Sequence, residues 1–217
     1  MVIIALIGID GCGKTTQAKI LLDNLIRDGF NAIYLQPILV FLNHPILSKI
    51  KQTPWCSPRI SATKKENTSK YGFIYRILIT LRSYMLYLFG YFYALFLYLY
   101  IRYLSIGHIV ICDRFFYQFF YDIYGNYSLS ICKYFPHPDL TFFLDIQPQL
   151  TYCRMTSDYD KTVKLGYYIN VAKLYYALFN NFNFNKIDAN LPSADLAEKI
   201  FVDTKKFILM RGISEYA

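Results

Sequence analysis

The first thirty residues limit the possible folds of this chain more than any other stretch. The segment "MVIIALIGIDGCGKTTQAKILLDNLIRDGF" predicts a buried strand over Val2 to Ile7, a glycine-rich turn, and a helix that ends near Gly29. The expected helix carries apolar residues at helical spacing: Ala18, Leu21, Leu22, Leu25 and Ile26. A strand, a tight loop and a helix in this order are typical of sheets that are covered by helices.

The turn itself has a spacing with chemical meaning. Gly8, Gly13, Lys14 and Thr15 match the pattern G-x-x-x-x-G-K-[ST]. Glycines let the backbone curl so that successive N–H groups point at one anion, and the start of the helix adds its positive dipole. In such a loop the lysine reaches the β and γ phosphates of a nucleotide, and the hydroxyl ligates Mg²⁺. The alternative is a tight glycine turn beside a surface lysine.

Cys12 lies within this loop and has two interpretations. Aligned N–H groups and a helix start could lower the pKa of its thiol and make it reactive. The other interpretation is a small apolar filler, since buried cysteine commonly plays that part.

Four further strands are expected along the chain. Helical patterns separate most of them, which indicates a mostly parallel sheet with helices on both faces and ligands beyond the carboxyl ends of the strands. Asp113 and Arg114 follow one such end, and Asp145 and Asp188 close two others. The expected strands are 31–36, 108–112, 140–146 and 182–188.

The run "SYMLYLFGYFYALFLYLYI", Ser83 to Ile101, contains no charge and is long enough for a transmembrane helix. A single crossing here would put Lys14 and Asp113 on opposite sides of a bilayer, although their strands belong to one sheet. We therefore expect two helices broken at Gly90 that cover the sheet and bury their surplus apolar face in a homodimer. The run is dense in tyrosine, which favours interfaces. Peripheral membrane attachment through the same helices is the alternative.

Composition sets the outer bounds. The 217 residues, 55% of them hydrophobic, suit one domain with a sizeable core. The net charge of +8 favours acidic or phosphorylated ligands, nucleic acid or an anionic membrane surface without choosing among them.

Five scattered cysteines argue against a disulfide framework or a zinc site, and we expect a cytoplasmic protein. The three histidines, which lack metal-ligand spacing, are read as structural: His44, His108 and His137.

Three segments resemble thymidylate kinases in order and spacing. They are "GIDGCGKTTQAKILLDNL", "GHIVICDRFFY" and "PDLTFFLDIQPQLTYCRM", which are similar to the phosphate loop, the Asp-Arg segment and the strand and helix that lead to the lid. The resemblance implies a P-loop NTPase fold, a three-layer α/β/α arrangement with a five-stranded parallel sheet and a small lid at about 155–166. The stretch from about 37 to 105, a variable loop followed by the tyrosine-rich helices, matches poorly.

The resemblance also implies ATP- and Mg²⁺-dependent phosphoryl transfer to a nucleoside monophosphate, most simply dTMP to dTDP, without a nucleic-acid partner. Lys14 and the backbone from Gly11 to Thr16, Cys12 included, would hold the donor phosphates. Thr15 would hold Mg²⁺ and Arg154 would face the adenine.

Asp10 would contact the acceptor sugar. Asp113 would orient Mg²⁺-bound water or the acceptor phosphate, and Arg114 would clamp the phosphoryl groups. Asp113 and Arg114 could instead form a strand-end ion pair, and Arg154 could be a surface cation.

The chain departs from the family pattern in three places. Phe115 stands where a tyrosine is usual, and "FYQFFYDIY" replaces the serine-rich segment that follows Asp-Arg. The expected lid contains Lys161 and Lys164 instead of an arginine. For the acceptor phosphate, Arg76 and Arg82 are the candidate ligands. Two rival functions therefore stay open: a P-loop kinase of another small acceptor, and a non-catalytic, membrane-associated nucleotide-binding protein.

Overall fold

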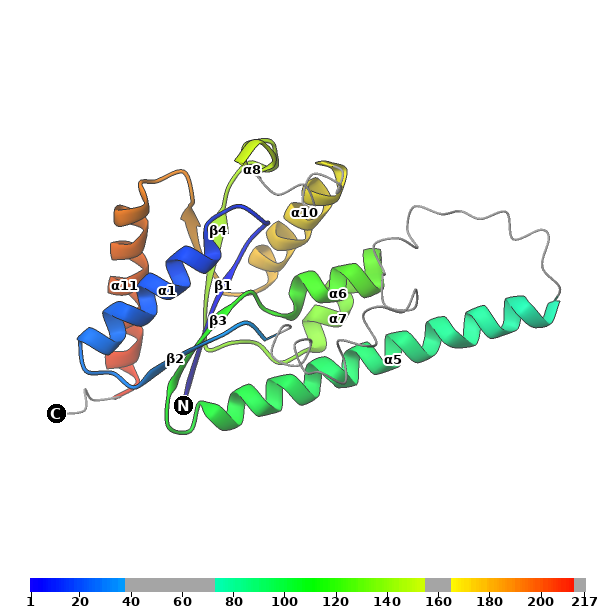
Figure 1. Cartoon of the computed structure of the whole chain (residues 1–217), viewed down its shortest axis with the longest axis horizontal. Coiled ribbons are helices and arrows are strands. Elements are labelled where there is room, and N and C mark those ends of the chain that lie inside the picture. The colour runs from blue at the N-terminus through cyan, green and yellow to red at the C-terminus, as the bar shows by residue number, and fades with distance from the viewer. Residues whose placement is uncertain (38–72, 155–164, 213–217) are drawn as a thin grey trace.

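The computed structural model describes residues 1–37, 73–154 and 165–212, with the backbone alone for 73–86 and 153–154. Its centre is a five-stranded, all-parallel sheet, as expected, and the structure places the strands in the order β2-β3-β1-β4-β5 (Figure 1). The strands are β1 (Val2–Ile7), β2 (Ala32–Leu35), β3 (Ile109–Asp113), β4 (Leu140–Asp145) and β5 (Asn185–Asp188). The last strand is shorter than predicted and begins at Asn185.

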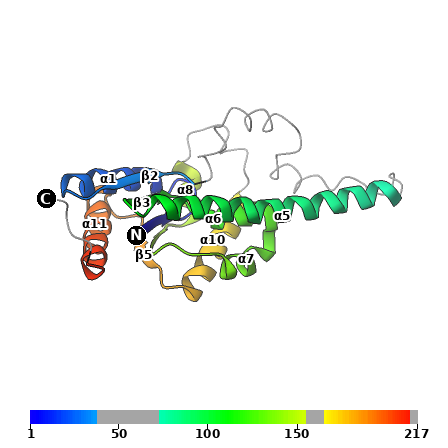
Figure 2. The same ribbon diagram turned by 90° about the horizontal axis from the view of Figure 1, so that it is seen from below.

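The sheet is central because its strands are apolar on both faces. All six residues of β1 are buried, as are all five of β3, because helices cover both sides. On one side lie α1 (Lys14–Arg27) and α11 (Ser193–Met210), which pack on each other. On the other side lie α5 (Phe73–Leu104), α6 (Phe116–Tyr124), α7 (Ser128–Tyr134) and α10 (Leu165–Asn181), as Figures 1 and 2 show. Two short helices, η3 (Gly125–Tyr127) and α8 (Pro148–Arg154), complete the described elements.

The tyrosine-rich segment forms one continuous helix, so the predicted break at Gly90 is wrong. Gly90 is buried against α6, where an added Cβ would lie 2.7 Å from Cδ1 of Ile123. Glycine therefore allows two helices to approach closely here and does not end the helix. Beyond it, Ala94, Leu97 and Ile101 are buried in the core.

The described part of the chain can be searched for a helix that could span a membrane. None of its helices combines enough length with enough uninterrupted apolarity to cross a bilayer.

Candidate active site

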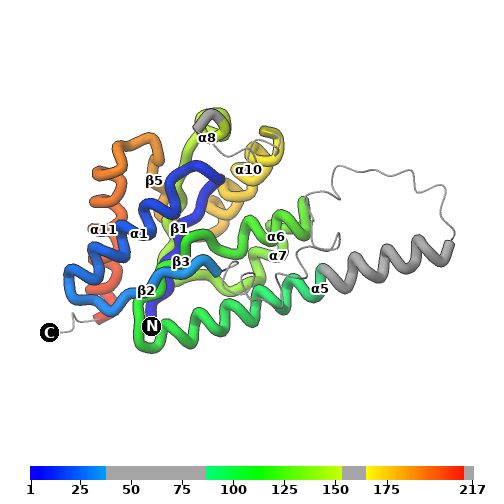
Figure 3. The backbone as a smooth tube through the Cα atoms, in the orientation of Figure 1, coloured from blue at the N-terminus to red at the C-terminus, as the bar shows by residue number. Residues whose placement is uncertain are grey.

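The loop between β1 and α1 curls over the carboxyl end of β1 before the chain enters the helix (Figure 3). Three of its glycines have positive φ: Gly8 at 146°, Gly11 at 83° and Gly13 at 92°. Side chains with a Cβ rarely adopt these angles, so the sequence pattern and the backbone agree. Helix α1 begins at Lys14 without a side-chain cap and without an acidic residue in its first turn. Its first N–H groups therefore lack a side-chain acceptor, as suits an anion site.

Lys14 is held inside the loop. Its side chain is 3% exposed, and its Nζ donates to the carbonyl oxygen of Ile9 at 2.7 Å. The same Nζ lies 3.8 Å from Oδ1 of Asp10. The ammonium group is thus held by residues of the same loop that matches the phosphate-binding pattern.

Asp113 ends β3 and is fully buried. Its Oδ2 accepts three hydrogen bonds: from Thr15 Oγ1 at 2.6 Å, from the Tyr34 hydroxyl at 2.7 Å and from Gln36 Nε2 at 2.7 Å. Its Oδ1 is buried without a hydrogen-bond partner among the described residues. Burial and the hydrogen bond to Asp113 raise the pKa of Tyr34, so this phenol stays a donor. The structure therefore joins the phosphate loop to β3 through the pair that the sequence suggested for a metal.

Arg114 has a left-handed backbone, with φ at 71°, which is unusual for a residue other than glycine. This conformation turns the chain from β3 into α6, and the Arg114 N–H donates to the carbonyl of Leu6 at 3.1 Å. The guanidinium Nη1 lies 2.5 Å from Oδ1 of Asp10. Burial lowers the pKa of Arg114, but the charge of Asp10, helped by Tyr175 and Asp113, outweighs burial and raises it. The predicted alternative, an ion pair between Asp113 and its neighbour Arg114, is not the contact observed, because Arg114 pairs with Asp10.

A second group of polar side chains lies beside Asp10 and was not identified from the sequence. Gln118 of α6 is 5% exposed, and its Nε2 lies 3.3 Å from both Oδ2 of Asp10 and the hydroxyl of Tyr167. Tyr167 in turn donates to Oδ1 of Asp122 at 2.5 Å. The rewritten segment "FYQFFYDIY" was the available signal, but spacing alone did not show that its glutamine reaches the phosphate loop.

Cys12 is buried at 3% exposure and lies 3.8 Å from Lys14 Nζ. Burial raises the pKa of its thiol, although the charge of Lys14 acts in the opposite direction. The thiol form is therefore favoured, which supports the filler interpretation over the reactive one.

The remaining predicted residues are less completely described. Thr16 is exposed in the first turn of α1. Arg154 is the last residue of α8, and Arg76 and Arg82 belong to α5, all three with the backbone alone described. Lys161 and Lys164 lie outside the described residues.

The described histidines have structural contacts. His108 Nδ1 contacts the carbonyl of Leu104 at 3.2 Å, and His137 Nδ1 contacts the Tyr117 hydroxyl at 2.8 Å. Within the described ranges no group of three or more His, Cys, Asp or Glu side chains could hold a metal ion without help from a ligand.

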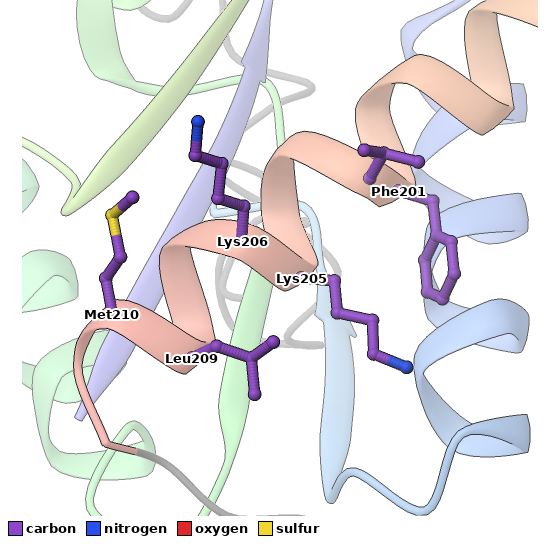
Figure 4. Close-up of a pocket in the computed structure, with 6 residues that line it drawn as sticks. Phe201, Lys205, Lys206, Leu209 and Met210 are labelled. Carbon is purple, nitrogen blue, oxygen red and sulfur yellow. The ribbon is translucent and has the colours of Figure 1, made fainter.

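A shallow depression elsewhere on the surface is a poor candidate for the site. It lies along the C-terminal half of α11, and it contains none of the residues predicted from the sequence (Figure 4). Its lining residues are Phe201, Val202, Lys205, Lys206, Leu209 and Met210.

Comparison with known proteins identifies the family of the chain. The family model described as thymidylate kinase matches residues 62–200, which include Asp113 and Arg114. The chain belongs to the thymidylate kinase family. The match starts inside the stretch where the sequence motifs found little resemblance, and the phosphate loop before it rests on its own motif. As a family member the chain is a nucleoside monophosphate kinase.

Two curated thymidylate kinase relatives extend the comparison. A probable thymidylate kinase of Staphylothermus marinus is 29% identical over 215 residues, spanning 93% of this chain and 92% of that protein. A probable thymidylate kinase of Sulfolobus acidocaldarius is 30% identical over 168 residues, spanning 74% of this chain and 72% of that protein.

Proposed function

We propose that this thymidylate kinase family member transfers the γ-phosphoryl group of ATP to dTMP with the help of Mg²⁺. The observation that carries the proposal is the 2.6 Å hydrogen bond between Thr15 of the phosphate loop and Asp113 at the end of β3. This contact brings together the two groups needed for a nucleotide-bound cation. The names of the two curated relatives support dTMP as the acceptor.

The donor side is built from the loop and the helix start. Lys14 supplies a positive charge for the β and γ phosphates, and the backbone from Gly11 to Thr16 supplies N–H donors. Arg154 at the end of α8 is assigned to the adenine, where a planar guanidinium stacks well.

The residues present fit a magnesium ion. Thr15 and Asp113 offer the oxygen donors that Mg²⁺ prefers, and Mg²⁺ commonly takes only one or two protein ligands because phosphates and waters complete its shell. The buried, unpartnered Oδ1 of Asp113 is an acceptor for a water or a cation. When bound, the ion would neutralise charge on the β and γ phosphates.

The acceptor side is built from Asp10 and Arg114. In the transfer an oxygen of the acceptor phosphate attacks the γ phosphorus, and the bond from that phosphorus to the bridging oxygen breaks, leaving ADP and dTDP. Arg114 would exchange its ion pair with Asp10 for phosphoryl oxygens, and the released carboxylate would accept from the acceptor sugar. Lys161 and Lys164 remain our candidates for the lid of the single domain, and Arg76 and Arg82 for the acceptor phosphate.

The test is ADP release from Mg·ATP with dTMP, dUMP, UMP, CMP, AMP and GMP in parallel. Lys14→Ala is the inactive variant, and Lys19→Ala, an exposed lysine on the same helix, is the matched control. We expect release to be fastest with dTMP, to disappear in Lys14→Ala and to persist in Lys19→Ala. A faster reaction with another nucleotide reassigns the acceptor. No stimulation by any nucleotide in a protein that binds ATP favours a different class of small acceptor.

We further propose that the chain is a homodimer through α5. One face of this helix is exposed and apolar, while Ala94 and Leu97 on the opposite face are buried. An exposed apolar stripe of this kind marks an interaction site. Beyond the adjacent pair Leu88 and Phe89, its residues recur every three or four positions, and all six are 57–69% exposed: Leu88, Phe89, Phe92, Phe96, Leu99 and Tyr103.

Sedimentation tests the dimer. Phe92→Glu with Phe96→Glu should yield monomers, because charges would be buried at the interface. Leu209→Glu, an equally exposed apolar position on α11, should leave the dimer intact. A wild-type monomer that pellets with anionic vesicles would instead support the peripheral membrane interpretation.

A further inference from the structure

Two residues at the end of β2 contact Asp113 and belong to neither the phosphate loop nor the Asp-Arg segment. The Tyr34 hydroxyl and Gln36 Nε2 both donate to Oδ2 of Asp113 at 2.7 Å. Alternate residues of a strand point the same way, which explains why two positions that differ by two reach one target. The parallel register pairs Tyr34 with Ile111 and Leu35 with Cys112, so the end of β2 lies next to the end of β3.

The third donor to the same oxygen is the Thr15 hydroxyl, at 2.6 Å. A hydroxyl has one proton and two lone pairs. Because the Thr15 proton points at Asp113, its lone pairs point elsewhere and are available to a cation. The direction of those lone pairs therefore depends on where Oδ2 of Asp113 lies.

Asp113 is fully buried, so its position is set by protein donors and by its strand. Short hydrogen bonds to a carboxylate are charge-assisted and directional. Because Tyr34 and Gln36 donate to Oδ2 from the end of β2 and Thr15 donates from the phosphate loop, this oxygen is tied to both elements.

We propose that Tyr34 and Gln36 are positioning residues, which orient the Asp113 and Thr15 pair toward a divalent cation that arrives with a nucleoside triphosphate. The inference rests on the proposed function for its ATP and Mg²⁺ site but not for its acceptor. Partners that orient metal ligands in this way commonly affect metal affinity strongly. The competing explanation is that the two bonds only attach β2 to β3.

The test uses the full chain and needs no turnover. Calorimetric titration gives the dissociation constant of ATP in EDTA and in saturating Mg²⁺, and their ratio is the factor by which Mg²⁺ tightens ATP binding. The variants are Tyr34→Phe, Gln36→Met and the double variant. Tyr176→Phe is the matched control, because Tyr176 donates to Asp145 at the end of β4 at 2.5 Å.

For the double variant we expect the Mg²⁺ factor to fall about tenfold, the lower end of the effect of outer-shell partners of a metal. Binding of ATP in EDTA should stay within about twofold of wild type, since the loop that holds the phosphates is unchanged. Tyr176→Phe should keep the wild-type factor. If the double variant does not fold, each single variant should still lower the factor by about threefold, its share of the tenfold effect.

An unchanged Mg²⁺ factor in folded Tyr34→Phe and Gln36→Met would overturn the inference and leave the bonds as strand attachments. An equal loss in Tyr176→Phe would also overturn it, because the effect would not be specific to Asp113. A wild-type protein whose ATP binding ignores Mg²⁺ would overturn both this inference and the proposed function. The expected pattern in a protein that does not phosphorylate dTMP would support the inference while refuting the proposed acceptor.

Discussion

Replacing Gly8 by alanine should destabilise the protein more than an alanine at Gly13 of the same loop. Gly8 has φ at 146°, and a Cβ built on it would lie 2.6 Å from the carbonyl oxygen of Leu144 and 2.8 Å from Sγ of Cys12. The backbone conformation costs about 1–3 kcal/mol for a residue with a Cβ. Forcing atoms apart in a packed region adds about 1–3 kcal/mol. We therefore expect a loss of about 2–6 kcal/mol in the free energy of unfolding.

Two other glycines separate these contributions. Gly13→Ala meets nothing within 4 Å but has φ at 92°, so it should cost only the conformational part, about 1–2 kcal/mol. Gly107→Ala meets nothing within 4 Å and has no positive φ, so its change should stay within about 0.5 kcal/mol. The double variant Gly8→Ala with Cys12→Ala removes the sulfur but keeps the carbonyl of Leu144.

Thermal and urea unfolding of the four variants decide the question. In a chain of this size 1 kcal/mol shifts Tm by about 2–4 °C, so Gly8→Ala should melt roughly 10 °C below wild type. Equal losses in Gly8→Ala and Gly13→Ala would refute the reasoning, because the close approach to Leu144 would then cost nothing. If the double variant loses no more stability than Gly13→Ala, the clash belongs to the sulfur alone, because only the conformational part remains.

Three further predictions concern other sites. The free energy of unfolding of Arg114→Gly should be about 1 kcal/mol higher than that of Arg114→Ala, because φ at 71° suits glycine. Both variants should lose about 100-fold or more in kcat. The reverse order of stability in urea unfolding would contradict this prediction. Burial lowers the pKa of His137 below 6.5, so the unfolded chain binds its proton first and stability should fall as pH drops below 6.5. His137→Gln should flatten that decline in thermal scans between about pH 7 and pH 5; an unchanged slope would show that other groups cause it. Asp139 accepts from three donors in separate elements, so Asp139→Asn should cost about 1–3 kcal/mol in urea unfolding, whereas the exposed Asp195→Asn should cost almost nothing.

Much of the site could be predicted because its parts are local. The pattern from Gly8 to Thr15 predicts a backbone conformation from residues that are adjacent in sequence, and the structure has positive φ at the glycines concerned. Asp113 and Arg114 could be placed near this loop because carboxyl ends of parallel strands share one edge of a sheet. Neither inference needed knowledge of side-chain contacts.

The contacts of Tyr34, Gln36 and Gln118 could not be predicted in the same way. Tyr34 and Gln36 meet Asp113 only because β2 is the neighbour of β3 in the order β2-β3-β1-β4-β5. Gln118 meets Asp10 only because α6 packs where it does on the sheet. Each contact joins residues more than seventy positions apart, and no local pattern encodes such a distance.

Gly90 is a position where the prediction from local propensity failed because of tertiary packing. By propensity a glycine in a long apolar run indicates a helix break, and the sequence alone favoured two helices. In the folded chain the helix continues, because the missing side chain allows α5 to approach Ile123 of α6. The sequence by itself determined the phosphate loop, the parallel sheet and the edge where the site lies, since these follow from local backbone preference and apolar patterning. Only the tertiary structure decided which side chains meet at that edge and how the tyrosine-rich helix runs, because close packing between distant elements outweighs local propensity.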